Sequence, residues 1–348
     1  MHLFQGVVLT MAWFWSSSVL AFTTTNQIPT NHQWRTSRCR FSLMQQQQPP
    51  LSLSQQPSPD TIQFFDEIVM SRTACKKFRR YGGNYTRSQD NTPPTPTPSD
   101  PSVVQRAWQC LRLAQRAPSS FNTQPYKVVL VHSPEHKKAL SRYALGPNQK
   151  RVLDADCTAI FLADRQVMRT LPKYMKWQLS SLPANKQPPG RKSKFMLALY
   201  ISLFSSGYPL PRFLAVPLSA LFRFAFSILE WFTRWFYVLP TFCNAEAWAY
   251  KQVMPVAMVY MLACTSRGLA TGPMEGINAA GIRKVLKIPR RYGIPLIVAT
   301  GLPYRTDEED GYTIAKDNQL LPSVVERYPM EDVIFSNQFG NSALVGMI

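Results

Sequence analysis

The first clear hydrophobic pattern in this chain has the period of an α-helix. From Asp60 to Ser71 the apolar residues Ile62, Phe65, Ile68 and Val69 recur on one helical face. No comparable pattern with charges on the opposite face precedes it. The pattern predicts an amphipathic helix and a folded part that begins near Asp60.

A second amphipathic helix is predicted from Val103 to Ala117. Its apolar stripe is expected to contain Val104, Trp108 and Leu111. The preceding stretch from Gly82 to Asp100 is rich in Pro, Thr and Asn, a composition typical of a loop.

Strands and helices are then predicted to alternate along the chain. Short apolar runs predict strands at 127–131, 158–163 and 295–301. Helical patterns predict a helix that begins at Ser133-Pro134 and further helices at 245–267, with Pro255 as a kink, and at 277–286. This order indicates an α/β or α+β sandwich.

The N-terminal region has the composition of a targeting sequence. Residues 3–21 are apolar and end in Val-Leu-Ala, whereas residues 22–59 lack Asp and Glu and are rich in Ser, Thr and Gln. The Ala21-Phe22 junction resembles that of presequences that enter the complex plastids of algae. We therefore expect a signal peptide-like segment at 1–21, a disordered transit-like segment at 22–59, and a plastid location. The alternative is a signal anchor followed by a disordered linker.

Composition narrows the chemistry that the chain can perform. The chain has 348 residues, of which 45% are hydrophobic, so it can bury a substantial core. Its formal charge of +19 favours anionic partners, but no nucleic-acid-reading motif accompanies the charge. Six scattered Cys without a CxxC pair and only four His argue against a metal site or a His-based triad. We expect no metal and no catalytic acid or base.

Two segments rich in small residues and proline are candidate ligand-binding loops. In "RAPSSFNTQPYKVV", from Arg116 to Val129, prolines restrict the backbone, and the segment is expected to hold peptide N–H groups outward for a flat, polar-edged ligand. In "GLATGPMEGIN", from Gly268 to Asn278, Gly272 and Pro273 are expected to join two helices and to let the backbone approach that ligand.

Two further segments carry cations suited to a phosphate group. "SRTACKKF", from Ser71 to Phe78, contains Arg72, Lys76 and Lys77, and "VERYPMEDVIF" contains Arg327. Phosphate monoesters favour such cations together with exposed backbone amides.

The four segments, in this order, resemble the nitroreductase family of flavin enzymes. The resemblance covers most of 60–340 except a long middle stretch. It implies an α+β fold, a three-layer sandwich with a central mixed sheet flanked by helices, built from 60–163 and 245–348. It also implies an FMN cofactor, a homodimer with shared flavin sites, and ping-pong hydride transfer from NADH or NADPH through FMN to a nitroaromatic, quinone or other aromatic acceptor.

The resemblance also implies which residues bind FMN. The "RTACKKF" match assigns Arg72, Thr73, Ala74 and Lys76, with Arg72 and Lys76 on the phosphate, and "ERYP" adds Arg327. The "APSSFNTQP" match assigns, from the neighbouring subunit, Pro118, Ser119, Ser120 and Asn122. The "GPMEG" match places the N–H of Glu275 against flavin N5 and assigns Pro273, Met274, Glu275 and Gly276.

Two departures from the family pattern leave alternatives open. Ala74 stands where the family usually has a serine, and Val325 where some members have a second late basic residue. Each loss is expected to cost about 1–3 kcal/mol of cofactor binding. One alternative is a relative that acts like the reductive dehalogenases of this superfamily. The other is a non-catalytic, membrane-associated flavin-binding or scaffold protein.

The stretch 164–244 is much longer than a simple substrate lid. Residues 169–194 contain seven Lys or Arg and no acid, and 195–204 and 213–236 are rich in Phe, Leu and Trp. Charges such as Arg223 interrupt the apolar stretch, so no window is long enough to span a bilayer. The pattern predicts a long hydrophobic helical insertion. One interpretation is that it contacts an anionic membrane surface, in which case a lipophilic acceptor such as a quinone is favoured. The alternative is an enlarged lid packed on the body or the dimer interface.

Overall fold

The computed structural model describes residues 58–79, 98–181, 190–207, 212–233, 243–303 and 327–340. The predicted targeting segments, apart from residues 58 and 59, lie outside the described residues, as do Val325 and most of the predicted 82–100 loop.

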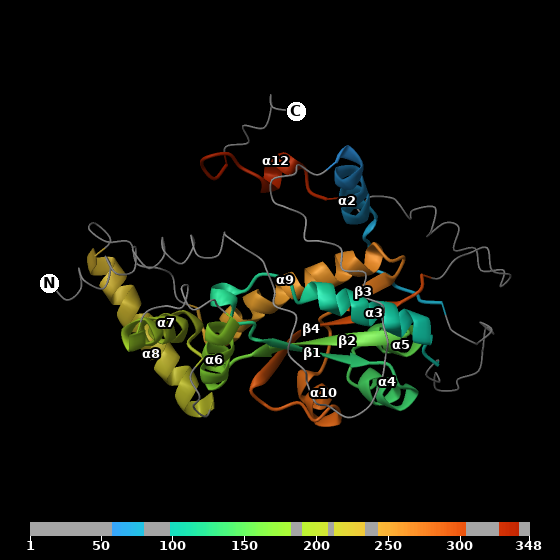
Figure 1. Ribbon diagram of the computed structural model, residues 1–348. Coiled ribbons are helices and arrows are strands. Elements are labelled where there is room, and N and C mark those ends of the chain that lie inside the picture. Colours follow the sequence, from blue (N-terminus) through green and yellow to red (C-terminus); the bar gives the residue numbers. More distant parts are fainter. Residues whose placement is uncertain are drawn as a thin grey trace.

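Four strands form the sheet at the centre of the molecule (Figure 1). They are β1 (Tyr126–Val131), β2 (Cys157–Asp164), β3 (Ala270–Met274) and β4 (Tyr292–Gly301), in the order β1-β2-β4-β3. Every pair of neighbouring strands is antiparallel, so the expectation of a mixed sheet is wrong for the described strands. Among the described residues, a parallel contact with this sheet is formed by an isolated bridge between Ala74 and Thr271.

Helices cover both faces of the sheet and make three layers (Figure 1). One face packs against α3 (Pro101–Ala114) and α9 (Ala245–Thr265), and the other against α4 (Pro134–Ser141), α5 (Asn148–Asp154) and α10 (Ala279–Val285). The chain also forms η1 (Ser120–Asn122), η2 (Val167–Arg169), α6 (Leu171–Ser181), α7 (Gly190–Ser205), α8 (Arg212–Thr233), α2 (Pro59–Ser71) and α12 (Met330–Val333).

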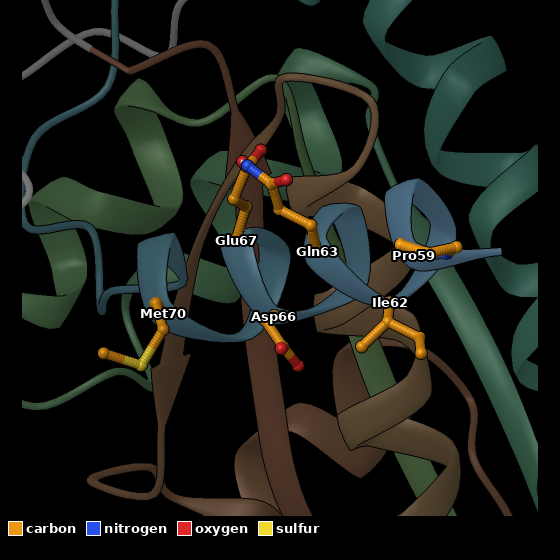
Figure 2. A pocket seen from close by; sticks show the side chains of 6 residues that line it. All are labelled: Pro59, Ile62, Gln63, Asp66, Glu67 and Met70. Atoms are coloured by element: carbon orange, nitrogen blue, oxygen red, sulfur yellow. The ribbon is translucent and has the colours of Figure 1, made fainter. Parts of the chain in front are cut away.

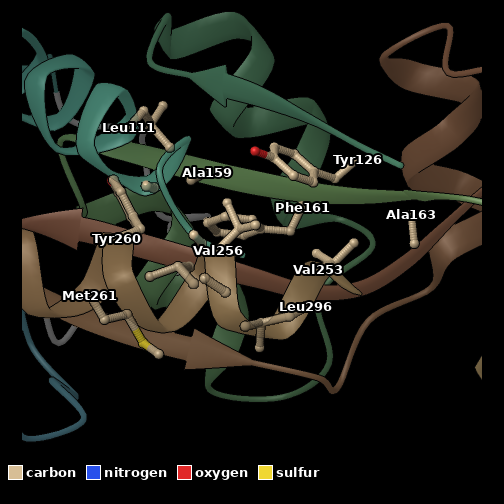
Figure 3. Close-up of a cluster of buried hydrophobic side chains, with 14 of the residues drawn as sticks. Leu111, Tyr126, Ala159, Phe161, Ala163, Val253, Val256, Tyr260, Met261 and Leu296 are labelled. Atoms are coloured by element: carbon tan, nitrogen blue, oxygen red, sulfur yellow. The ribbon is translucent and has the colours of Figure 1, made fainter. Parts of the chain in front are cut away.

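The main core lies between the sheet and the α3–α9 pair (Figure 3). All eight residues of β2 are buried, which explains why this strand is a continuous apolar run. The ring of Phe161 meets that of Tyr260 edge-on at 5.8 Å. The Tyr260 hydroxyl shares a buried hydrogen bond of 2.9 Å with the Thr300 hydroxyl, which satisfies both polar groups.

Most predicted helices and strands agree with the structure, and the differences concern β3, α5 and the buried face of α3. The segment 268–278, expected to join two helices directly, forms the edge strand β3, and α5 was not predicted. The predicted stripe of α3 is rotated, because Trp108 is 52% exposed while Val103, Ala107 and Cys110 are fully buried. The side of this helix that faces the protein core therefore includes small residues such as Ala107 and Cys110. Small side chains contribute little to the hydrophobic pattern that is visible in the sequence.

The predicted apolar face of α2 is not buried within the described chain. None of its residues is buried, and Phe65 is 56% exposed. A hollow of about 530 Å³ lies along the helix, lined by Pro59, Ile62, Gln63, Asp66, Glu67 and Met70. Figure 2 shows Ile62 and Asp66 pointing to one side of α2 and Gln63 and Glu67 to the other. The helix is thus available to pack against another surface.

The segment that follows α2 runs along the outer edge of β3. Ala74 forms its parallel bridge with Thr271, and the Cys75 N–H donates to the Thr271 carbonyl at 2.8 Å. A Cβ atom added to Gly272 would lie 2.8 Å from the Cys75 carbonyl oxygen. Gly272 therefore permits the close approach of two chain segments, while the expected approach of a ligand to this backbone stays a prediction.

We predict that Gly272→Ala lowers the free energy of unfolding by about 1–3 kcal/mol, because the methyl group forces the two segments apart. Denaturant unfolding measures this change. Gly268→Asn is the control: nothing lies within 4 Å of its added Cβ and its φ of +67° is one that Asn tolerates. Equal stability of the Gly272→Ala variant and the wild type would contradict the packing described.

Candidate functional site

The first group of predicted site residues lies at the β3 edge of the sheet. The backbone N–H of Arg72 ends α2 by donating to the Ile68 carbonyl at 3.2 Å, and its side chain is half-buried. Lys76 is exposed. Within the described residues neither Arg72 nor Lys76 forms an ion pair with a carboxylate. Two uncompensated positive charges are thus available to an anion.

The backbone that carries these cations is fixed at both ends. Beyond Ala74 and Cys75, Phe78 is fully buried and bridges to Pro303, and the Arg79 N–H donates to the Leu302 carbonyl at 3.0 Å. Such anchoring limits the entropy lost when a ligand binds.

The Cys75 thiol is a structural group in this segment. Burial raises its pKa to about 11, although the backbone of Lys77 and the positive charge of Arg151 act in the opposite direction. The thiol itself donates to the Lys77 carbonyl at 2.9 Å. The thiol is therefore protonated at neutral pH and is not a nucleophile.

The turn after β3 carries the second set of predicted residues. Met274 is buried at the end of the strand, and Glu275 is exposed immediately after it. The Gly276 carbonyl accepts from the Leu145 N–H at 2.9 Å, which fixes the turn. Because the 72–79 segment runs parallel to β3 at the Ala74 bridge, Lys76 lies toward this turn. The structure therefore places the 72–76 segment beside β3, the strand that leads into the 273–276 turn.

The third set lies in the loop between α3 and β1, which has an unusual backbone. Phe121, Asn122 and Gln124 have φ values of 54°, 52° and 45°, in the left-handed region that non-glycine residues rarely adopt. Three such residues in one short loop are maintained only when the surroundings fix them, and strain of this kind clusters at functional sites.

The amide groups of this loop are used inside the protein. The Ser120 N–H donates to the Gln252 side-chain oxygen at 2.7 Å, and the N–H groups of Asn122 and Gln124 donate to the Ser119 carbonyl and hydroxyl, at 2.8 and 3.0 Å. The expected outward array of N–H groups is therefore wrong for residues 120, 122 and 124. Any polar contact with a ligand falls to side chains such as the Ser120 hydroxyl.

Gln252 is a functional residue that the sequence analysis missed. It lies on α9 and is buried, and its acceptor fixes the loop that carries Pro118 to Asn122. In the sequence, Gln252 is the one uncharged amide residue in 245–265, and mainly apolar residues follow it. A buried polar side chain in such a helix is held by a hydrogen bond.

The first two helices of the 164–244 stretch pack against the same loop. The Tyr174 hydroxyl of α6 donates to the Phe121 carbonyl, and burial raises the pKa of this hydroxyl, which keeps it a donor. The Phe204 ring of α7 lies 5.9 Å from the Phe121 ring, and Ile201 is fully buried in the main core. Helices α6 and α7 therefore match the alternative of a lid packed on the body.

The expected single hydrophobic insertion is instead divided into helices in different environments. α6 and α7 contribute residues to the core, whereas α8 carries many exposed apolar side chains. In the part of the chain that the structure describes, no helix has the length and apolar character needed to cross a membrane.

Arg327 begins the described C-terminal segment 327–340 and is exposed. Its role at the phosphate stays a prediction. The same holds for the assignments of Thr73, Pro118 and Asn122.

Comparison with known proteins relates part of this chain to a family. The family model described as "Nitroreductase family" matches residues 105–197 and 244–302. Over these residues the chain is similar to the nitroreductase family. Its match begins within α3 and ends just after β4, and it omits residues 198–243, which contain α8.

Individual proteins that resemble this chain have low sequence identity to it. A protein of Thermus thermophilus named NADH dehydrogenase is 26% identical over 229 residues, which are 65% of this chain and 82% of that protein. A nitroreductase family protein from Streptococcus pneumoniae has a TM-score of 0.48 and 18% identity, and covers 78% of this chain and 99% of its own. A protein from Exiguobacterium sibiricum, solved in complex with FMN, has a TM-score of 0.43 and 16% identity, and covers 73% and 94%.

We predict that Gln252→Met destabilises the protein by about 1–3 kcal/mol, because the Ser120 N–H loses its buried acceptor. Chemical denaturation measures the effect. The matched control is Gln105→Met on the exposed side of α3, which is expected to change stability by less than about 0.5 kcal/mol. Equal effects of the two substitutions would show that Gln252 does not fix the loop.

Proposed function

We propose that this protein is an FMN-dependent oxidoreductase that transfers hydride from NADH or NADPH to a nitroaromatic, quinone or other aromatic acceptor. The observation that carries the proposal is the bridge that joins the 72–79 segment to β3. It places two unpaired cations and an exposed turn along one edge of the sheet, an arrangement that suits a phosphorylated, planar cofactor.

The residues at this edge fit FMN. Arg72 and Lys76 would bind its phosphate, since no described carboxylate neutralises them. The Glu275 N–H would face N5 of the flavin, and the side chains of Ser120 and Asn122 would line the ring from the second subunit. When bound, FMN supplies the hydride-accepting and hydride-donating chemistry, and the protein supplies orientation and exclusion of water.

No side chain is needed as an acid or base in this proposal. Glu275 would act through its backbone N–H, whose position is set by the fixed Gly276 turn. The Glu275 carboxylate is exposed. Orientation by a rigid backbone is the contribution that flavin chemistry requires from the protein.

The exposed apolar face of α2 supports a homodimer. Phe65 and its apolar neighbours on this helix remain largely exposed within the described chain, and a second copy would remove them from water. We propose that this contact also brings the 118–122 loop of one subunit to the β3 edge of the other.

The acceptor and the cellular location are further parts of the proposal. Reductive dehalogenation of an aromatic substrate, or a non-catalytic flavin-binding role, remain alternatives. A plastid location is supported by the acid-free composition of 22–59.

We predict that Arg72→Gln weakens FMN binding about 10- to 100-fold, because a charge-assisted phosphate contact is worth roughly 1.5–3 kcal/mol. Ala74→Ser, which restores the hydroxyl usual in the family, is expected to tighten binding up to about tenfold. Titration of flavin fluorescence measures both. Arg112→Gln on exposed α3 removes the same charge at a remote position and should leave the affinity unchanged. Equal losses for the two arginine variants would refute the phosphate assignment.

Anaerobic mixing of the flavin-loaded protein with NADH or NADPH tests the reaction itself. We expect the absorbance of oxidised flavin to disappear, and to return when a quinone or nitroaromatic is added. Return only on addition of a halogenated phenol would identify the dehalogenase-like alternative. Persistent oxidised flavin with both donors would contradict the proposed NAD(P)H-dependent reaction.

A further inference from the structure

Helix α8 presents a broad apolar surface to solvent. Its exposed apolar residues include Phe213, Leu221, Phe224, Ile228, Trp231 and Phe232, and Phe213 is 75% exposed. At 100° per residue these six side chains fall within an arc of about 100° on one face of the helix. An uninterrupted face of this size is rare on a soluble monomer and marks an interaction site.

The opposite side of α8 is the more polar one. Ser219 is buried, and Arg223 is half-buried, with its Nε atom buried and without a hydrogen-bond partner among the described residues. A helix packed on a protein core normally buries its apolar face and exposes its charges. In α8 this arrangement is reversed, so the aromatic face meets an apolar environment outside the described body.

The fold of the family does not account for this surface. The family match omits residues 198–243, so α8 belongs to the part by which this chain departs from its relatives. The preceding helices α6 and α7 already cover the Phe121 loop, which leaves α8 free for another role.

The charges beside α8 indicate what it contacts. Helices α6, α7 and α8 gather at one end of the body (Figure 1). At this end Arg169, Lys173 and Lys176 are exposed, and residues 169–194 contain seven cations and no acid. Basic residues next to an aromatic helix face are typical of segments that lie on an anionic membrane surface.

We propose that α8 lies in the plane of an anionic bilayer surface, with its aromatic face in one leaflet and the cations of α6 at the lipid headgroups. Because no described helix is suited to span a membrane, the contact is interfacial. This inference goes beyond the oxidoreductase function and does not depend on bound flavin.

Trp231 provides a local test in the full-length chain. Vesicles of phosphatidylserine and brominated phosphatidylcholine quench tryptophans that enter the acyl region, so the contribution of Trp231 is the difference between wild type and Trp231→Phe. We expect quenching in the wild type, a smaller quenched fraction in Trp231→Phe, and no such reduction in Trp108→Phe, which removes a comparably exposed ring from α3. Equal quenching of wild type and Trp231→Phe would overturn the proposal.

Two further variants test the apolar face and the cations separately. Phe224→Glu should abolish Trp231 quenching, whereas Lys173→Gln with Lys176→Gln should weaken binding about fivefold per lysine and reduce its salt dependence. Circular dichroism checks that each variant keeps its helices. If Phe224→Glu leaves quenching intact, or if quenching is absent and Phe224→Glu instead dissociates a dimer, α8 contacts a second copy and the membrane proposal is wrong.

Discussion

The close approach of the 72–79 segment to strand β3 is the contact on which the proposed site depends. It rests on one hydrogen bond, from the Cys75 N–H to the Thr271 carbonyl, and on the missing side chain of Gly272. Without this approach, Arg72 and Lys76 would lie on an unattached connection after α2. With it, they are held at the β3 edge of the sheet.

The sequence was sufficient for most elements. Long or continuously apolar runs were recognised because they carry a strong hydrophobic signal: β2 is buried throughout, and α9 packs its long apolar stretch into the core. The edge strand β3 was missed because Gly272 and Pro273 are poor strand formers, and only the pairing with β4 and Cys75 makes them extended. Tertiary contact decided the local structure there.

The details of the Phe121 loop could not be predicted from local chemistry. The sequence correctly indicated a rigid, polar segment, but its amides turn inward because Gln252, 132 residues away, supplies the acceptor for Ser120. The left-handed backbone at Phe121 and Asn122 is held by this bond and by Tyr174. Such long-range partners leave no periodic trace in a single sequence.

The account makes one central physical claim, that the cations at the β3 edge recognise the phosphate of the flavin. Comparison of the affinities for FMN and for riboflavin, which lacks only that phosphate, measures this directly. The account predicts that FMN binds at least about a hundredfold more tightly, and that Arg72→Gln removes most of the difference. Equal affinity for the two flavins, or no binding of either, would contradict it.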